Sequence, residues 1–199
     1  MPYFNILVET SENTVVTEYE PVKKRSDSYQ SEAELEQEFI RLLCEQGYEY
    51  LLIHTEKDLI ANLRKKLEEL NNYRFSDTEW EDFFKNAVAN PNEHIVEKTR
   101  KIQEDNVQVL TRDDGSSKNI TLIDKKNIHN NRLQVINQYV IGTEDGAKHD
   151  NRYDVTVLVN GLPLVHIELK RRGVAIREAF NQINRYQRDS FWAGCGLYE

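Results

Sequence analysis

The sequence predicts an α/β fold in which a mixed β-sheet is flanked by helices. Three observations support this prediction. Amphipathic segments with capping residues fill the first half, alternating segments separated by turn residues fill residues 106–170, and a helical period returns after Gly173. The length of 199 residues suits a domain large enough to bury a substantial core.

The pattern of residues 4–102 predicts a β-hairpin followed by several helices. Phe4–Glu9 and Thr14–Glu20 alternate apolar and polar residues, as the strands of a hairpin do. Ser31 and Glu34 form a capping box that predicts the start of a helix, which Gly47 would end. Further helical stretches are Asp58–Asn71, Ser76–Val88 and about Glu93–Ile102.

The second half of the chain changes to a period typical of strands. The predicted strands are 106–110, 120–123, 132–141, 153–159 and 162–170. Asn160-Gly161 separates the last two, and this dipeptide is typical of a tight hairpin turn. Apolar residues then return at helical spacing at Ile176, Ala179, Phe180, Ile183 and Tyr186.

Composition argues against several classes of protein. No apolar run is long enough for a membrane span, and the N-terminus lacks the regions of a signal peptide, so we expect a cytoplasmic protein without a membrane partner. Cys44 and Cys195 form neither a CxxC pair nor a zinc spacing, which favours buried or idle thiols. The net charge of −8 divides into +3 for Glu168–Asp189 and −11 for the remainder. The basic segment is either a phosphate-binding region or a solvated helix face.

The register of the last predicted hairpin decides where its polar side chains lie. A two-residue loop at Asn160-Gly161 would pair Asp154 with Ile167 and place a carboxylate on an apolar face. A loop longer by one residue, or a bulge nearby, pairs Asp154 with Glu168 instead. The apolar pattern then predicts two carboxylates and Lys170 on one exposed face of the sheet.

Paired carboxylates beside a lysine suit metal-assisted hydrolysis of phosphodiesters. Two close carboxylates repel each other unless a hard divalent cation lies between them, and Mg²⁺ prefers carboxylate oxygens. The cation polarises a phosphate while the lysine stabilises developing negative charge. The same acid-x-Lys spacing occurs at Asp124-Lys125-Lys126, where no partner strand supplies a carboxylate, and we predict the end of a strand there. Gln182 and Tyr186 lie one turn apart on the last helix, as at a helix edge.

Taken together, these residues resemble the PD-(D/E)xK nuclease superfamily, in the branch that carries a QxxxY element. The residues that carry the resemblance are Asp154, Glu168-Leu169-Lys170 and Gln182 with Tyr186. More narrowly, residues 151–183 are similar to the N-terminal endonuclease domain of the R (HsdR) subunit of type I restriction enzymes. Weaker similarity extends back through residues 122–127 and 27–32.

This resemblance implies a restriction-endonuclease-like fold and a role for each matching residue. Asp154 and Glu168 would bind Mg²⁺, and Lys170 would be the catalytic lysine. Gln182 and Tyr186 would assist cleavage or DNA contact.

Other residues near the motif remain open. Such sites often include a glutamate from the first helix, and the spacing does not choose between Glu32 and Glu36. His166 lies on the predicted carboxylate face, where a polar sheet residue is expected. Candidate phosphate contacts, with a solvated face as the alternative, are Arg171, Arg172, Arg177 and Arg185.

The resemblance also implies a function. It implies a bacterial or archaeal Mg²⁺-dependent endonuclease that cleaves unmodified foreign double-stranded DNA together with a methyltransferase core of modification and specificity subunits. No G-x-x-x-x-G-K occurs, so we expect no ATP site in this chain. Two alternatives stay open: a catalytically silent module that docks on DNA or the methyltransferase, and a recombination or repair nuclease of the same superfamily.

These patterns also predict how the chain is organised. We expect residues 1–25 to form a hairpin and linker, and residues 26–199 to form the nuclease domain with a helical insertion at about 56–104. The final residues Phe191–Glu199 are typical of a chain cut inside a domain, so we expect a fragment of a longer protein.

Overall fold

The computed structural model describes residues 3–9, 15–20, 31–141, 151–171 and 173–189, with side chains for 31–140, 152–171 and 173–184. The chain divides into two units, Met1–Gln30 and Ser31–Glu199. The first unit contains β1 (Tyr3–Glu9) and β2 (Val15–Glu20), which pair antiparallel. This pair confirms the predicted hairpin.

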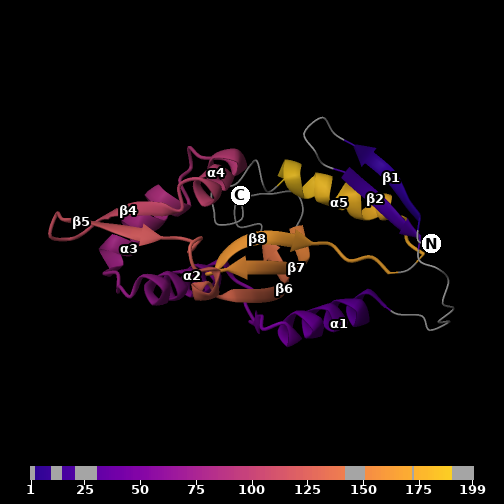
Figure 1. The fold of residues 1–199 in the computed structure, drawn as a ribbon, viewed down its shortest axis with the longest axis horizontal. Coiled ribbons are helices and arrows are strands. Elements are labelled where there is room, and N and C mark those ends of the chain that lie inside the picture. The colour runs from indigo at the N-terminus through magenta and orange to yellow at the C-terminus, as the bar shows by residue number, and fades with distance from the viewer. Residues whose placement is uncertain (1–2, 10–14, 21–30, 142–150, 172, 190–199) are drawn as a thin grey trace. The chain divides into compact units, whose positions relative to one another are not determined.

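A mixed four-stranded sheet is the centre of the second unit (Figure 1). Its strands, in spatial order, are β3 (Glu49–Tyr50), β6 (Leu133–Ile141), β7 (Asn151–Val159) and β8 (Leu162–Ile167). β3 runs parallel to β6, and the other neighbours are antiparallel. The mixed α/β architecture is confirmed. The sequence does not predict β3, because two residues are too few to show an alternating pattern.

Helices surround this sheet and largely match the predicted stretches. They are α1 (Glu32–Glu45), α2 (Glu56–Asn71), α3 (Asp77–Phe83), α4 (Ile95–Gln103) and α5 (Ile176–Asp189). The capping box of Ser31 and Glu34 opens α1 as predicted, because each side chain bonds the backbone N–H of the other residue. No helix in the described part of the chain is long and apolar enough to cross a membrane.

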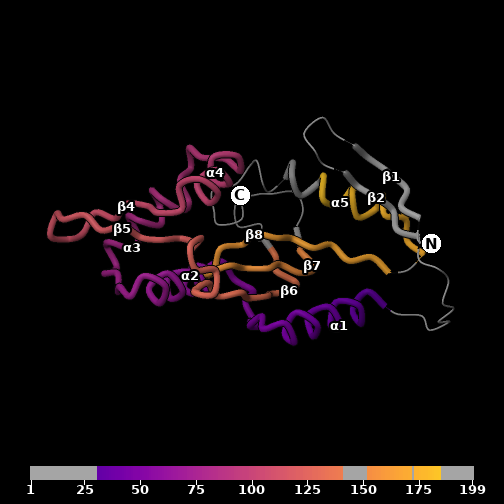
Figure 2. The backbone as a smooth tube through the Cα atoms, viewed as in Figure 1, coloured from indigo at the N-terminus to yellow at the C-terminus, as the bar shows by residue number. Residues whose placement is uncertain are grey.

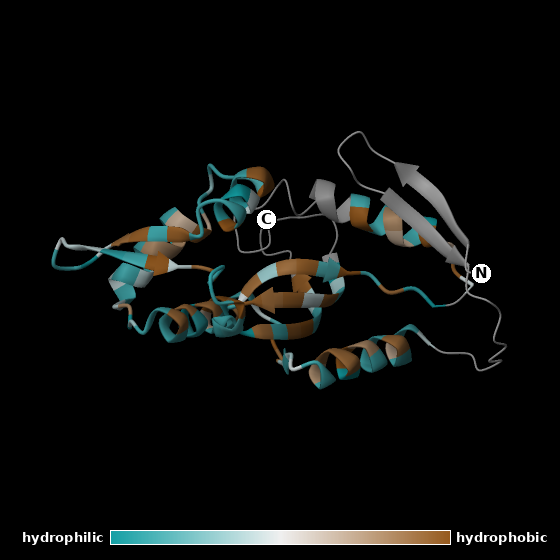
Figure 3. Ribbon diagram, viewed as in Figure 1, coloured by the Kyte–Doolittle hydropathy of each residue, from teal (hydrophilic) through white to brown (hydrophobic). Residues whose placement is uncertain are grey.

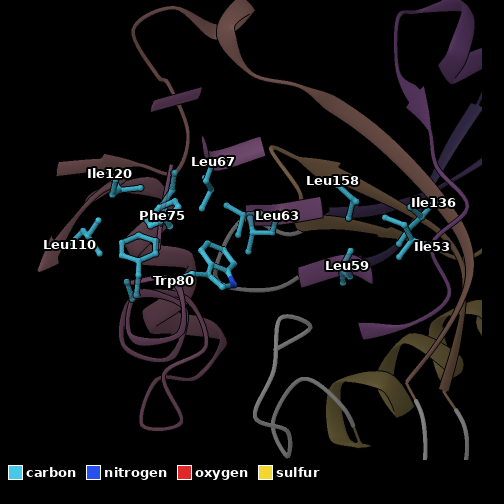
Figure 4. Close-up of a cluster of buried hydrophobic side chains, with 14 of the residues drawn as sticks. Ile53, Leu59, Leu63, Leu67, Phe75, Trp80, Leu110, Ile120, Ile136 and Leu158 are labelled. Carbon is cyan, nitrogen blue, oxygen red and sulfur yellow. The ribbon is translucent and has the colours of Figure 1, made fainter. Parts of the chain in front are cut away.

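The helical region between β3 and β6 shares its core with the sheet. Figure 2 shows the chain running from α1 through α2, α3 and α4 and then back to the sheet as β6, and β3 lies between α1 and α2. This region also contains the hairpin of β4 (Val107–Thr111) and β5 (Ser117–Thr121). Leu59 and Leu63 of α2 belong to the same buried cluster as Ile136 and Leu158 of the sheet (Figure 4). The region predicted as a helical insertion therefore packs into the main hydrophobic core.

Both faces of β7 are buried, which corrects the prediction of an exposed carboxylate face. Val155 and Leu158 are 0% exposed and Thr156 is 1% exposed, although these residues point to different sides of the strand. Apolar residues predominate along the sheet strands, whereas α1 alternates between apolar and polar residues (Figure 3). The prediction failed because a strand covered on both sides needs no polar face.

The β7–β8 hairpin contains the bulge that the apolar pattern requires. Val155 lies opposite Ile167, but the register shifts between Val157 and Leu158, so that Leu158 lies opposite Pro163. The turn itself has only two residues, Asn160 and Gly161, with φ of 52° and 85°. Of the two predicted alternatives, the structure therefore contains the bulge and not the longer loop.

Close packing explains the glycine in this turn. A Cβ on Gly161 would lie 2.6 Å from the Cα of Leu63 in α2. The turn therefore needs glycine both for its positive φ and for the approach of the α2 backbone. β8 ends at Ile167, three residues before the predicted end, so the Glu168–Lys170 segment follows the strand.

Candidate active site

Asp154 and Glu168 lie together where β7 and β8 separate. Val155 is opposite Ile167, so the next step along the two strands brings Asp154 opposite Glu168. The backbone N–H of Leu169 donates a 2.9 Å hydrogen bond to Oδ2 of Asp154, which holds the segment after β8 against β7. The side chain of Glu168 is only 3% exposed. The juxtaposition predicted from the register is therefore present in a largely buried setting.

Lys170 completes this group. Its Nζ donates a 2.5 Å hydrogen bond to Oε1 of Glu168. Burial raises the pKa of Glu168 against the opposing effect of Lys170, and the charge of Asp154 raises it further. Burial disfavours the charge on Lys170, but contact with Glu168 and the nearby Asp154 and Glu32 raise its pKa overall. Lys170 is therefore a cation at neutral pH and is suited to stabilise negative charge.

The donor set fits a hard divalent cation. Two carboxylates are held together although their repulsion raises the pKa of Glu168, and a cation between them would relieve that repulsion. Mg²⁺ is commonly held by one or two carboxylates together with waters and substrate phosphates. Across the described ranges, no three or more His, Cys, Asp or Glu side chains converge as metal ligands. Asp154 and Glu168 are the two carboxylates that meet here, and their role as metal ligands stays a prediction.

A cavity of about 480 Å³ lies beside Lys170. Its lining residues are Glu32, Lys170, Arg171, Val174, Glu178, Asn181 and Gln182. The structure thus brings Gln182 of α5 to the same cavity as Lys170. Tyr186 is also on α5, but its side chain lies outside the described residues.

A second cavity of about 480 Å³ lies on the α1 side of Asp154. Its lining residues are Glu32, Ala33, Glu36, Gln37, Ile40, Tyr50, Asn137, Gln138, Arg152 and Asp154. Both candidate glutamates of the first helix therefore face the same cavity as Asp154.

Glu32 and Glu36 nevertheless have different partners. Oε1 of Glu32 accepts a long hydrogen bond of 3.4 Å from the backbone N–H of Arg171, and Glu32 lines both cavities. Glu36 is 8% exposed, and its two oxygens accept hydrogen bonds from the side-chain amides of Asn137 and Gln138. The structure places Glu32 beside Lys170, while the carboxylate of Glu36 is engaged with β6.

Sequence reasoning missed three residues that line this second cavity. Asn137 and Gln138 lie inside a predicted strand, where nothing in the pattern distinguishes them, and Gln138 adopts a φ of 52° that is unusual for glutamine. Arg152 precedes Asp154 by two residues and brings a positive charge to an otherwise acidic cavity. Arg152 lies within residues 151–183, which resemble the R subunit, so its closeness to Asp154 in the sequence could have marked it as a candidate site residue.

The candidate phosphate contacts are only partly described. Arg171 and Arg177 are exposed, and Arg171 lines the cavity beside Lys170. The side chains of Arg172 and Arg185 lie outside the described residues. DNA contact by these arginines stays a prediction.

His166 on β8 is partly buried and has structural partners. Its ring stacks on Tyr153 with 4.6 Å between ring centroids, and its Nδ1 lies 3.0 Å from Oγ1 of Thr156 in a hydrogen bond. Burial lowers the pKa of His166 to about 4. His166 is therefore neutral at physiological pH and fills the sheet face, as expected for a polar sheet residue.

The second acid-x-Lys copy has a local structural role. Oδ1 of Asp124 accepts hydrogen bonds from the backbone N–H groups of Lys126 at 3.0 Å and Asn127 at 2.9 Å, and Oδ2 accepts one from Asn130 at 2.8 Å. These hydrogen bonds, with the one from the backbone of Asn127 as the largest contribution, lower the pKa of Asp124. Asp124 thus organises the loop that follows β5, which ends at Thr121. Of the two cysteines, Cys44 is a free exposed thiol, and Cys195 lies outside the described residues.

The fold and the site define a restriction-endonuclease-like α/β domain with two carboxylates and a lysine at the end of one strand pair. Comparison with known families agrees with this description. Residues 29–198 match the family described as type I restriction enzyme R protein N terminus. The chain belongs to this family.

Curated relatives carry matching names. The endonuclease subunit of the type I restriction enzyme EcoprrI from Escherichia coli is 50% identical over 194 residues, which are 97% of this chain and 61% of the relative. A type I restriction enzyme endonuclease subunit from Staphylococcus saprophyticus is 39% identical over 168 residues, 82% of this chain and 17% of the relative. The HindI endonuclease subunit from Haemophilus influenzae is 29% identical over 179 residues, 79% of this chain and 17% of the relative. The chain therefore spans only part of the length of these relatives.

Proposed function

We propose that this chain is the Mg²⁺-dependent nuclease domain of a type I restriction R subunit, which hydrolyses phosphodiester bonds of unmodified foreign double-stranded DNA. The observation that carries the proposal is the contact of Asp154 with Glu168 and of Glu168 with Lys170 at one end of the β7–β8 pair. The names of the curated relatives, endonuclease subunits of type I restriction enzymes, support the same activity.

Each side chain has a chemical role in this proposal. Mg²⁺ held by Asp154 and Glu168 supplies Lewis acidity toward a scissile phosphate and toward water. Lys170, a cation at neutral pH, stabilises the negative charge that develops on the phosphate oxygens. Gln182 lines the same cavity as Lys170, and its amide can orient the phosphate or the attacking water by hydrogen bonds. Tyr186 completes the QxxxY pair.

The charge distribution supports delivery of the domain to DNA by other subunits. A chain with a net charge of −8 is a poor free binder of DNA, because phosphate binding needs cationic charge. We therefore propose that the modification and specificity subunits of a type I complex bring DNA to this domain in the cytoplasm. Arg171, Arg172, Arg177 and Arg185 would then contact phosphates only at the cleavage site.

The test uses the full-length R subunit assembled with its partner subunits. Asp154→Ala, Glu168→Ala and Lys170→Ala should each abolish DNA cleavage and leave ATP-driven translocation intact. Lys126→Ala is the matched control, because Lys126 is exposed and holds the lysine position of the second acid-x-Lys copy. It should leave cleavage unchanged. Retained cleavage in any of the three site variants would overturn the proposal.

A further inference from the structure

The carboxylate of Glu36 on α1 binds two consecutive residues of β6. Asn137 Nδ2 donates to Oε1 at 2.6 Å, and Gln138 Nε2 donates to Oε2. In a regular strand, consecutive side chains point to opposite faces, so one carboxylate would not reach both. The left-handed φ of 52° at Gln138 interrupts this alternation. Glu36 thus holds an irregular step in β6.

The orientation of one of these amides is fixed by a further contact. The hydroxyl of Tyr50 donates a 2.8 Å hydrogen bond to Oδ1 of Asn137. This bond turns the Nδ2 donor of Asn137 toward Glu36. Glu36 itself is 8% exposed, so its two amide partners replace most of the solvent around its charge.

The irregular step of β6 faces Asp154 on the neighbouring strand β7. The ladder pairs the residues on either side, so Gln138 of β6 lies opposite Asp154 of β7. The irregular step of β6 is therefore the neighbour of Asp154 across the strand pair.

We propose that Glu36 is a positioning residue for Asp154, because it holds the irregular step of β6 that lies opposite Asp154 and borders the same cavity. The inference rests on the proposed function, since it takes Asp154 to be a cation ligand. Glu36, Gln138 and Asp154 line the same cavity, so a change of the backbone at Gln138 would shift Asp154 within that cavity.

Mn²⁺ binding to the 199-residue chain, followed by electron paramagnetic resonance, tests this role without measuring activity. We call the two hydrogen bonds from Asn137 and Gln138 to Glu36 the clamp. In Glu36→Gln the new amide N–H would face these amide donors, so the clamp loses one of its two hydrogen bonds. We expect Mn²⁺ affinity to fall by about 10- to 100-fold, as when groups that orient metal ligands are altered. Glu38→Gln, which removes the same charge from an exposed position of α1, should bind like the wild type.

A swapped pair separates positioning from direct coordination and from a general loss of folding. In Glu36→Gln with Gln138→Glu, the amide at 36 can donate to the carboxylate at 138 and accept from Asn137, so the clamp is rebuilt with its polarity reversed. We expect this double variant to regain near wild-type Mn²⁺ affinity. Persistent weak binding would overturn the positioning role. Equal Mn²⁺ binding by the wild type and Glu36→Gln would also overturn the positioning role, but not the proposed function. Absence of Mn²⁺ binding by the wild type would instead contradict the proposed function.

Discussion

Nζ of Lys170 lies 2.5 Å from Oε1 of Glu168, and this ion pair is largely buried at the point where Glu168 meets Asp154. The positive charge of Lys170 thus offsets the repulsion between the carboxylates of Glu168 and Asp154. This arrangement explains how the two acids stay together before a cation binds.

Removal of that lysine should destabilise the chain in a manner that depends on pH. We expect Lys170→Ala to lower the free energy of unfolding by about 1–3 kcal/mol at pH 7 in the presence of a chelator, because a buried carboxylate loses its partner. The pKa of Glu168 is already raised, so Glu168 takes up a proton as the pH falls and the repulsion disappears. Urea unfolding of variant and wild type at the same pH should therefore show a smaller difference at pH 5. An equal or larger difference there would contradict this explanation.

His166 predicts a second pH effect. Its folded pKa of about 4 lies below the unfolded value of 6.5, so the stability it contributes is present above pH 6.5 and is lost as the pH falls toward 4. At pH 5 the loss should be about 2 kcal/mol. Urea unfolding should show that wild type loses about this much more than His166→Gln between pH 7.5 and pH 5. Parallel losses in the two proteins would show that His166 is not the group responsible.

Asn160 joins the β7–β8 turn to the loop after β5. Its Nδ2 donates to the carbonyl of Leu122 at 3.0 Å and to Asn131 at 2.8 Å, and its Oδ1 accepts from the N–H of Arg132 at 2.8 Å. We expect Asn160→Ala to cost about 3 kcal/mol in thermal or urea unfolding, since these buried partners are left unpaired.

A glycine at the same position isolates the contribution of the backbone. Asn160 has a φ of 52°, which glycine adopts without strain. Asn160→Gly should therefore be about 1 kcal/mol less destabilising than Asn160→Ala. Equal costs would mean that the hydrogen bonds alone determine the choice of residue.

Asp124 provides a contrast with the candidate site. Its carboxylate accepts hydrogen bonds from its own loop, so Asp124→Ala should lower the free energy of unfolding. Cleavage by the full-length subunit carrying this variant should equal that of the wild type at a temperature where both are folded. Loss of cleavage with unchanged stability would assign chemistry to the second acid-x-Lys copy.

Local signals predicted much of the fold. The capping box at Ser31 is a contact between residues three apart, and the structure shows it as the sequence predicts. The pairing of Val155 with Ile167 was also predictable, because a register that mixes apolar and charged faces is costly.

Other features depend on contacts that a local pattern does not contain. The exposed carboxylate face was wrong because α2, far away in sequence, covers Leu158. Spacing could not choose between Glu32 and Glu36, since the difference lies in their partners: a backbone N–H after β8 for one and two amides of β6 for the other. The left-handed φ of Gln138 has no sequence signal, because glutamine rarely adopts it.

The most direct test of the central claim is plasmid cleavage by a type I complex whose full-length R subunit carries Asp154→Asn. This substitution keeps the shape of the side chain and removes the charge that would hold Mg²⁺ beside Glu168. With ATP and Mg²⁺ present, we predict that unmodified circular DNA is translocated at the wild-type rate and stays uncut. Linear DNA formed at the wild-type rate would contradict the assignment of this site.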